Sequence, residues 1–176
     1  EWGMEQIVRD TRISTLYEGT TGIQALDLLG RKVLMTQGGA LKNFTKLMHT
    51  FCKEEADNEE LAPFVTKLVE MNKEWGDLTM KVGMTSMKNR DEVGSASVDY
   101  LMYSGYVTLA YIWAKMAKVA QTALSNGTTE EDFYKAKLTT ARFYFTRILP
   151  RTNFHAESMV AGADTLMDLA EEHFQF

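Results

Sequence analysis

The sequence has little of what marks secreted, nucleic-acid-binding or membrane-spanning proteins. A single cysteine, Cys52, among 176 residues rules out an internal disulfide and fits a reducing compartment. A net charge of -5 and the lack of a basic stripe argue against a nucleic-acid partner, because lysine and arginine bind phosphates. The longest apolar stretch, residues 106–114, is far shorter than the ~20 residues of a membrane span. The composition therefore predicts a cytoplasmic protein without a membrane span.

Only two prolines interrupt the chain, and its apolar residues recur at the three- and four-residue spacing of helices. Residues 143–145 could suit a strand, but the flanking alanine- and lysine-rich sequence favours helix, and no strand pair with hairpin signals is present. The sequence therefore predicts an all-α fold, an N-terminal helical hairpin followed by an up-and-down bundle. The predicted helices cover residues 4–16, 23–34, 41–51, 64–82, 91–124, 128–149 and 155–172.

Glycines and candidate cap residues mark where the predicted helices begin and end. Gly38 and Gly39 mark the best internal boundary, which separates residues 1–37 from residues 38–176. Asp91 is expected to cap the fifth helix, and Thr128 with Glu131 fits a capping box for the sixth. Because the chain opens on a glutamate directly in helix-like sequence, we expect a processed or truncated start.

Several side chains have structural interpretations. Cys52 lies in an amphipathic run, so we expect it to fill the core rather than to act as a nucleophile. The 11 methionines are mostly expected in the core as well, and the acidic cluster at residues 54–60 is expected to form a solvated loop. No Glu-x-x-His pair is present, so we expect no di-metal site.

One segment carries more than a helical pattern. It reads Arg9-Asp10-Thr11-Arg12-Ile13, then Leu16-Tyr17-Glu18-Gly19-Thr20-Thr21-Gly22-Ile23-Gln24. It resembles the part of acyl-CoA dehydrogenases in which an Arg-Asp-x-x-Ile helix leads into Tyr-Glu-Gly-Thr and then a helix that opens with Ile-Gln. Residues 23–32 resemble a longer bacterial branch, which has an extra helical domain after the usual C-terminal bundle. The similarity is densest over residues 1–35, and later it rests on helical pattern and on Ala161-Gly162-Ala163.

The resemblance implies an oxidoreductase that uses FAD to dehydrogenate the alpha,beta bond of an acyl-CoA thioester, with Glu18 as the base. A carboxylate in a glycine-flanked joint can project into a cleft, and an apolar acyl pocket would raise its pKa from about 4.3. The resemblance also implies that Tyr17 and Gly19 contact the substrate. Tyr17 is alternatively a boundary aromatic with its hydroxyl in water.

The same resemblance places the cofactor on the helix that follows. Thr20, Thr21, Gly22 and Gln24 are implied to contact FAD, although many family members have glutamine where this chain has Gly22. Thr21 is alternatively a simple N-cap. Arg9 and Asp10 are expected to form a surface or interdomain ion pair rather than to act in catalysis.

The resemblance implies the partners and the domain roles too. Residues 1–37 would end the C-terminal helical domain of the dehydrogenase, and residues 38–176 would form the additional bundle. The implied partners are an acyl-CoA substrate, an electron-transfer flavoprotein and further copies of the chain in a homo-oligomer. Since other domains complete the sites of such enzymes, these 176 residues alone are expected to be inactive. The alternative is a non-catalytic helical-bundle module for interaction or oligomerisation.

Overall fold

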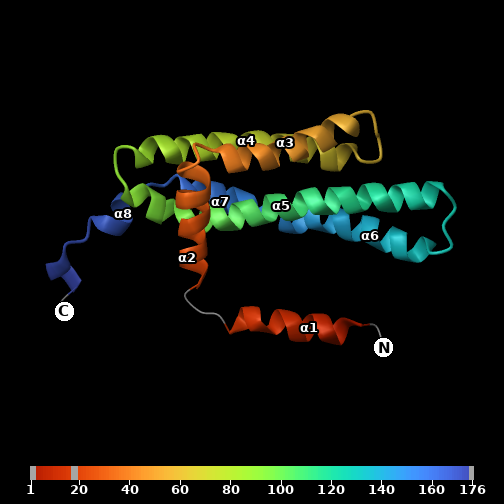
Figure 1. Cartoon of the computed structure of the whole chain (residues 1–176), viewed down its shortest axis with the longest axis horizontal. Coiled ribbons are helices and arrows are strands. Elements are labelled where there is room, and N and C mark those ends of the chain that lie inside the picture. The colour runs from red at the N-terminus through yellow and green to blue at the C-terminus, as the bar shows by residue number, and fades with distance from the viewer. Residues whose placement is uncertain (1–2, 17–19, 175–176) are drawn as a thin grey trace.

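The computed structural model describes residues 3–16 and 20–174, and every regular element within these ranges is a helix. Long helices lie side by side in a bundle, while α1 lies apart from it (Figure 1). The all-α fold is therefore confirmed. The α-helices are α1 (Met4–Arg12), α2 (Thr20–Leu26), α3 (Gly39–Glu54), α4 (Ala62–Ser86), α5 (Asp91–Ser125), α6 (Glu131–Phe143), α7 (Arg151–Met159) and α8 (Asp164–Met167). Shorter 3-10 or π segments are η1 (Ile13–Thr15), η2 (Asp27–Leu34), η3 (Tyr144–Ile148) and η4 (Glu171–Phe174).

The 35-residue helix α5 is the centre of the bundle. Its buried residues recur at steps of three and four, which places them on one face of the helix. Alanines on this face let α6 and α7 approach closely, whereas two tyrosines reach α4. The Tyr100 hydroxyl lies 2.8 Å from Thr79 Oγ1, and the Tyr103 hydroxyl donates to Glu74 Oε2 at 2.8 Å. Because buried hydroxyl groups need hydrogen-bond partners, these two contacts fix the position of α4 along α5.

Aromatic side chains fill the space between α3, α4 and α5. Phe44 packs edge-on against Trp75 and against Tyr111, with ring centroids 5.9 Å apart in both pairs. Phe51 packs edge-on against Tyr111 at 5.8 Å. Edge-to-face pairs add attraction beyond the burial of their area. This cluster therefore holds α3 against the two longer helices.

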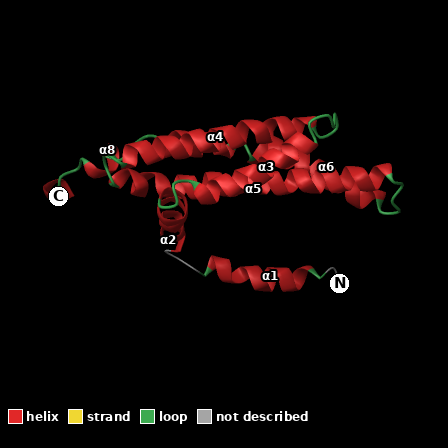
Figure 2. Cartoon of the chain, turned by 45° about the horizontal axis from the view of Figure 1, so that its top comes forward, coloured by secondary structure: helices red, strands yellow, loops and turns green. Residues whose placement is uncertain are grey.

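Part of the N-terminal segment packs on the bundle. Leu29 and Val33 of η2 are buried in the main core cluster. A Cβ at Gly30 would lie 3.8 Å from Val93 Cγ1, an ordinary van der Waals distance, so Gly30 lies beside the first turn of α5. In contrast, α1 and η1 bury no residue. Figure 2 shows α1 on the side of α5 opposite α4, with α2 between α1 and the bundle.

Three predicted helix boundaries were wrong. The helix expected over 155–172 divides, because the chain turns at Gly162, whose φ of 90° favours glycine. Asp91 is the first residue of α5 rather than its cap, and its amide donates to Asn89 Oδ1 at 3.0 Å. The capping box is absent, because Thr128 Oγ1 accepts from the amide of Glu130, ahead of the start of α6.

The methionine prediction was also wrong. Met48, Met71 and Met159 are buried, but most of the 11 methionines are exposed. The exposed ones are Met4, Met35, Met80, Met84, Met87, Met102 and Met167. Cys52 is buried as predicted, and burial raises the pKa of its thiol, which makes it inert as a nucleophile.

The acidic loop after α3 contains one buried carboxylate. Glu55 pairs with Lys118 of α5, and its Oε2 accepts from Asn58 Nδ2 at 3.1 Å. Asn58 also exchanges two 3.0 Å hydrogen bonds with Gln121 of α5. The loop is thus tied to α5 rather than fully solvated. The ion pair with Lys118 holds the pKa of the Glu55 carboxyl below its ordinary value.

We expect Glu55→Gln to lower the free energy of unfolding by about 1 kcal/mol at pH 7. A lowered folded-state pKa stabilises the fold above the unfolded pKa of about 4.3, and this contribution is lost as the pH falls further. The deficit of the variant should therefore shrink between pH 5 and pH 3, measured by urea unfolding. Glu59→Gln, an exposed change in the same loop, is the control. A deficit that does not change with pH would contradict this assignment.

Candidate functional site

The centre of the predicted active-site motif lies outside the described residues. This applies to Tyr17, Glu18 and Gly19, whose predicted roles stay predictions. The flanking elements are described: η1 ends at Thr15, and α2 begins at Thr20. The motif therefore joins two helices, as the sequence predicts for the residues on either side.

The four predicted cofactor contacts lie together at the start of α2. Thr20, Thr21, Gly22 and Gln24 are all exposed, at the end of α2 that points away from α4 (Figure 1). A Cβ at Gly22 would meet nothing within 4 Å, so a ligand can approach the backbone there. Ala25 is the only buried residue described in α2.

The surroundings of these four residues agree with the expectation that they form one edge of a flavin site. The first amides of a helix lack partners within the helix, and two threonine hydroxyls accompany them here, which suits phosphate or hydroxyl groups. Because all four residues are exposed, they enclose nothing by themselves. The remaining walls would have to come from other polypeptide.

Segment η2, which follows α2 in the chain, carries a local ion-pair cluster. Asp27 pairs with Arg31 and, at 3.0 Å, with Lys32 Nζ, and these cations hold the pKa of the Asp27 carboxyl below its ordinary value. On α1, Arg9 Nη2 donates to Gln6 Oε1 at 2.9 Å, while Gln6 Nε2 donates to Asp10 Oδ1 at 2.6 Å. The predicted ion pair of Arg9 and Asp10 is thus replaced by contacts of both residues with Gln6.

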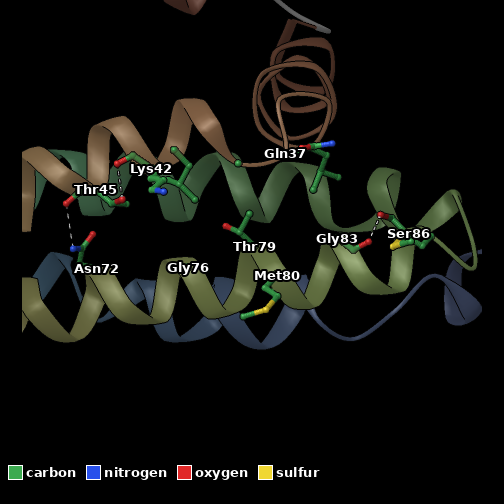
Figure 3. A pocket seen from close by; sticks show the side chains of 13 residues that line it. Gln37, Lys42, Thr45, Asn72, Gly76, Thr79, Met80, Gly83 and Ser86 are labelled. Carbon is green, nitrogen blue, oxygen red and sulfur yellow. Dashed lines mark hydrogen bonds between the residues drawn. The ribbon is translucent and has the colours of Figure 1, made fainter.

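A separate cavity of about 620 Å³ lies between α4 and the junction of η2 with α3 (Figure 3). None of the motif residues that the structure describes lines it. Gly76 and Gly83, one heptad apart on α4, face it, and a Cβ at Gly76 would meet nothing within 4 Å. Sequence analysis missed this cavity, although two glycines inside one helix were a signal of close approach or open space.

The described lining of the cavity contains no pair of ionisable side chains that could serve as acid and base. Lys42 is the only ionisable side chain among the described residues that line it. Asn72 Nδ2 donates to the carbonyl of Thr45 at 3.3 Å, and the buried Asn72 Oδ1 has no partner among the described residues. General acid–base catalysis on a substrate uses an acid and a base with access to it, and the described lining supplies no such pair.

The described ranges contain no candidate for a membrane span or for a metal site. No helix within residues 3–16 and 20–174 has both the length and the apolar character to cross a membrane. Within the same residues no group of three or more histidine, cysteine, aspartate or glutamate side chains is placed to hold a metal ion.

Comparison with known proteins places the chain. The sequence model of the family described as acetyl-CoA dehydrogenase C-terminal like matches residues 44–170. A broad-specificity linear acyl-CoA dehydrogenase of Mycobacterium tuberculosis is 30% identical over 182 aligned residues, which cover 99% of this chain and 30% of that protein. A 3-methylmercaptopropionyl-CoA dehydrogenase of Ruegeria pomeroyi is 29% identical, with coverage of 95% of this chain and 28% of that protein.

A butyryl-CoA dehydrogenase of Syntrophomonas wolfei is 25% identical over 98% of this chain and 28% of its own length. This chain therefore spans less than a third of the length of these relatives. The family match begins at Phe44, after the motif, in the bundle where the motif-based resemblance was least dense. The chain belongs to the acetyl-CoA dehydrogenase C-terminal-like family and corresponds to a C-terminal portion of an acyl-CoA dehydrogenase.

Proposed function

We propose that the chain is the C-terminal part of an FAD-dependent enzyme that dehydrogenates the alpha,beta bond of an acyl-CoA thioester. The observation that carries this proposal is the alignment of nearly the whole chain with proteins named acyl-CoA dehydrogenases. The motif of residues 9–24 supports the same activity independently of the family match, which starts at residue 44. The boundary between residues 1–37 and 38–176 as dehydrogenase domain and added bundle is part of the proposal.

Glu18 is proposed to remove the alpha proton of the thioester. The C–H bond breaks, and the proton moves to the carboxylate, which must be ionised and within hydrogen-bond reach. An apolar acyl group lying against the site would expel water and raise the pKa of Glu18 toward neutrality. Tyr17 and Gly19 flank this carboxylate in sequence and would contact the acyl chain and the thioester.

FAD, when bound, would accept the beta hydrogen as hydride. Thr20, Thr21, Gly22 and Gln24 would hold one edge of it, since they lie exposed at the start of α2. An electron-transfer flavoprotein would then receive the electrons, and further copies of the chain would complete a homo-oligomer. Because the described residues form only this edge, turnover would need the polypeptide that forms the other walls.

The test is the visible spectrum of the full-length gene product, taken before and after anaerobic addition of a panel of acyl-CoA thioesters. Bound flavin should bleach with its preferred acyl-CoA, because hydride transfer reduces it. Free coenzyme A is the control and should leave the spectrum unchanged. A well-folded protein without flavin would overturn the proposal and favour the interaction module.

A further inference from the structure

Helix α5 carries a second apolar stripe besides the one in the core. Its residues alternate in steps of four and three, the spacing of a helix face that packs along another helix. The five large side chains at positions 98, 102, 109, 112 and 119 are between 39% and 61% exposed. We call this stripe the seam, and it consists of Val98, Met102, Gly105, Leu109, Ile112, Met116 and Val119.

The seam lies on the side of α5 that faces away from α4. Tyr100 and Tyr103 mark the α4 side, through their contacts with Thr79 and Glu74. At about 100° per residue, the middle of the seam lies roughly 150° around the helix from Tyr100. Helix α1 also lies on the side of α5 opposite α4 (Figure 2). The seam therefore faces the side of the molecule on which α1 lies.

The other two helices on that side also expose apolar side chains. On α2, Ile23 and Leu26 are exposed, and on α1 the exposed residues include Ile7 and Val8. Beyond η2, which packs on α5, α2 adds seven residues, or about 10 Å. The C-terminal part of α2 packs on the bundle, where Ala25 is buried, and its N-terminal end points away from the bundle toward α1 (Figure 1).

The C-terminal half of the seam is hollowed and flanked by positive charge. A groove of about 350 Å³ runs between α5 and α6, with Ile112, Met116, Val119 and Phe133 as its apolar lining. Lys115 and Lys137 border it, and no acidic residue occurs among the described residues that line it. An apolar helix that carries carboxylates beside its apolar face would complement both features.

We propose that the seam, with α1 and α2, is the docking surface for the polypeptide that precedes Glu1 in the full-length gene product. This inference rests on the proposed function, since the relatives carry about 70% of their length outside the part that this chain matches. The occupant is a layer of helices with an apolar face and carboxylates opposite the two lysines. It would cover the apolar sides of α1, α2 and α5 together.

A second copy of the chain is the weaker occupant. Two copies paired through α5 alone would cover the seam but leave the apolar residues of α1 and α2 in water. A layer between α1 and α5 covers all three helices. Folded proteins rarely leave large apolar surfaces exposed. The exposed apolar residues on all three helices therefore favour the preceding polypeptide of the same chain over a second copy.

The test measures the maleimide labelling of single introduced cysteines in the full-length gene product, located by peptide mass spectrometry. Ile112→Cys lies on the seam, and Val69→Cys on the outer face of α4 is the matched control. Both are β-branched residues in mid-helix, 43% and 52% exposed. We expect I112C to be labelled at least about tenfold more slowly than V69C, because labelling requires local opening of the interface. Equal labelling rates would overturn the proposal.

Two further measurements identify the occupant. Labelling of L109C should rise by about tenfold when I112E is added, because a buried charge loosens the interface. Adding V69E should leave it unchanged, and circular dichroism checks that each variant is folded. Protection that disappears on dilution as the molecular mass halves would assign the seam to a second copy and overturn the proposal. Labelling needs neither flavin nor turnover, so a protected seam in a flavin-free protein would refute the enzymatic proposal alone.

Discussion

Replacing Glu18 by glutamine should lower the rate of acyl-CoA dehydrogenation by about 10⁴-fold in the full-length gene product, the upper range for loss of a general base. Glutamine keeps the size and hydrogen-bonding shape of the side chain but cannot take the alpha proton. Flavin content and folding should therefore stay unchanged. The measurement is the rate of flavin bleaching by the preferred acyl-CoA in a stopped-flow instrument under anaerobic conditions.

The matched control is Glu157→Gln, which neutralises an exposed carboxylate on α7. It should react at the rate of the parent protein. A normal rate for E18Q would show that another group removes the proton, even if the protein binds flavin. Loss of flavin from E18Q would instead assign Glu18 a role in cofactor binding.

Replacing Leu68 by alanine should lower the free energy of unfolding by about 2–5 kcal/mol, the range for truncating a fully buried leucine. Leu68 is 0% exposed and belongs to the main core cluster on α4. The change removes apolar contacts and leaves a cavity, because α3 and α5 hold the surrounding side chains in place. Urea unfolding followed by circular dichroism measures the loss.

Its neighbour Val69 is the matched control. Val69 follows Leu68 on the same helix but points outward and is 52% exposed. Val69→Ala should change the stability by less than about 0.5 kcal/mol, since it removes little buried area. Similar losses for L68A and V69A would mean that α4 is rotated from the orientation described above.

The long helices were predictable because their stabilising pattern is local and periodic. Pro63 at the start of α4 and Asn126 at the end of α5 lie where the sequence places helix boundaries. The shorter signals failed. Asp91 and Thr128 were predicted as caps, but short polar side chains serve turns as readily as caps, and neighbouring backbone decided between them.

Exposure was harder to predict than helicity. Met71 and Met80 both lie on α4, and both were expected to fill the core. Only Met71 is buried. Glu55 lies in an acidic run that predicted a solvated loop, but Lys118, 63 residues later, pairs with it. Such outcomes depend on which helices become neighbours, and periodicity within one helix contains no information on this point.

The sequence by itself determined that the chain is helical, that it resembles acyl-CoA dehydrogenases and which residues are the candidates for chemistry. Helical spacing and a contiguous motif are properties of neighbouring residues, so they can be read without a fold. Only the tertiary structure decided that η2 packs across α5, that Glu55 is buried and that a seam on α5 stays exposed. These depend on contacts between residues far apart in the sequence, because burial is a property of packed helices and not of any one of them.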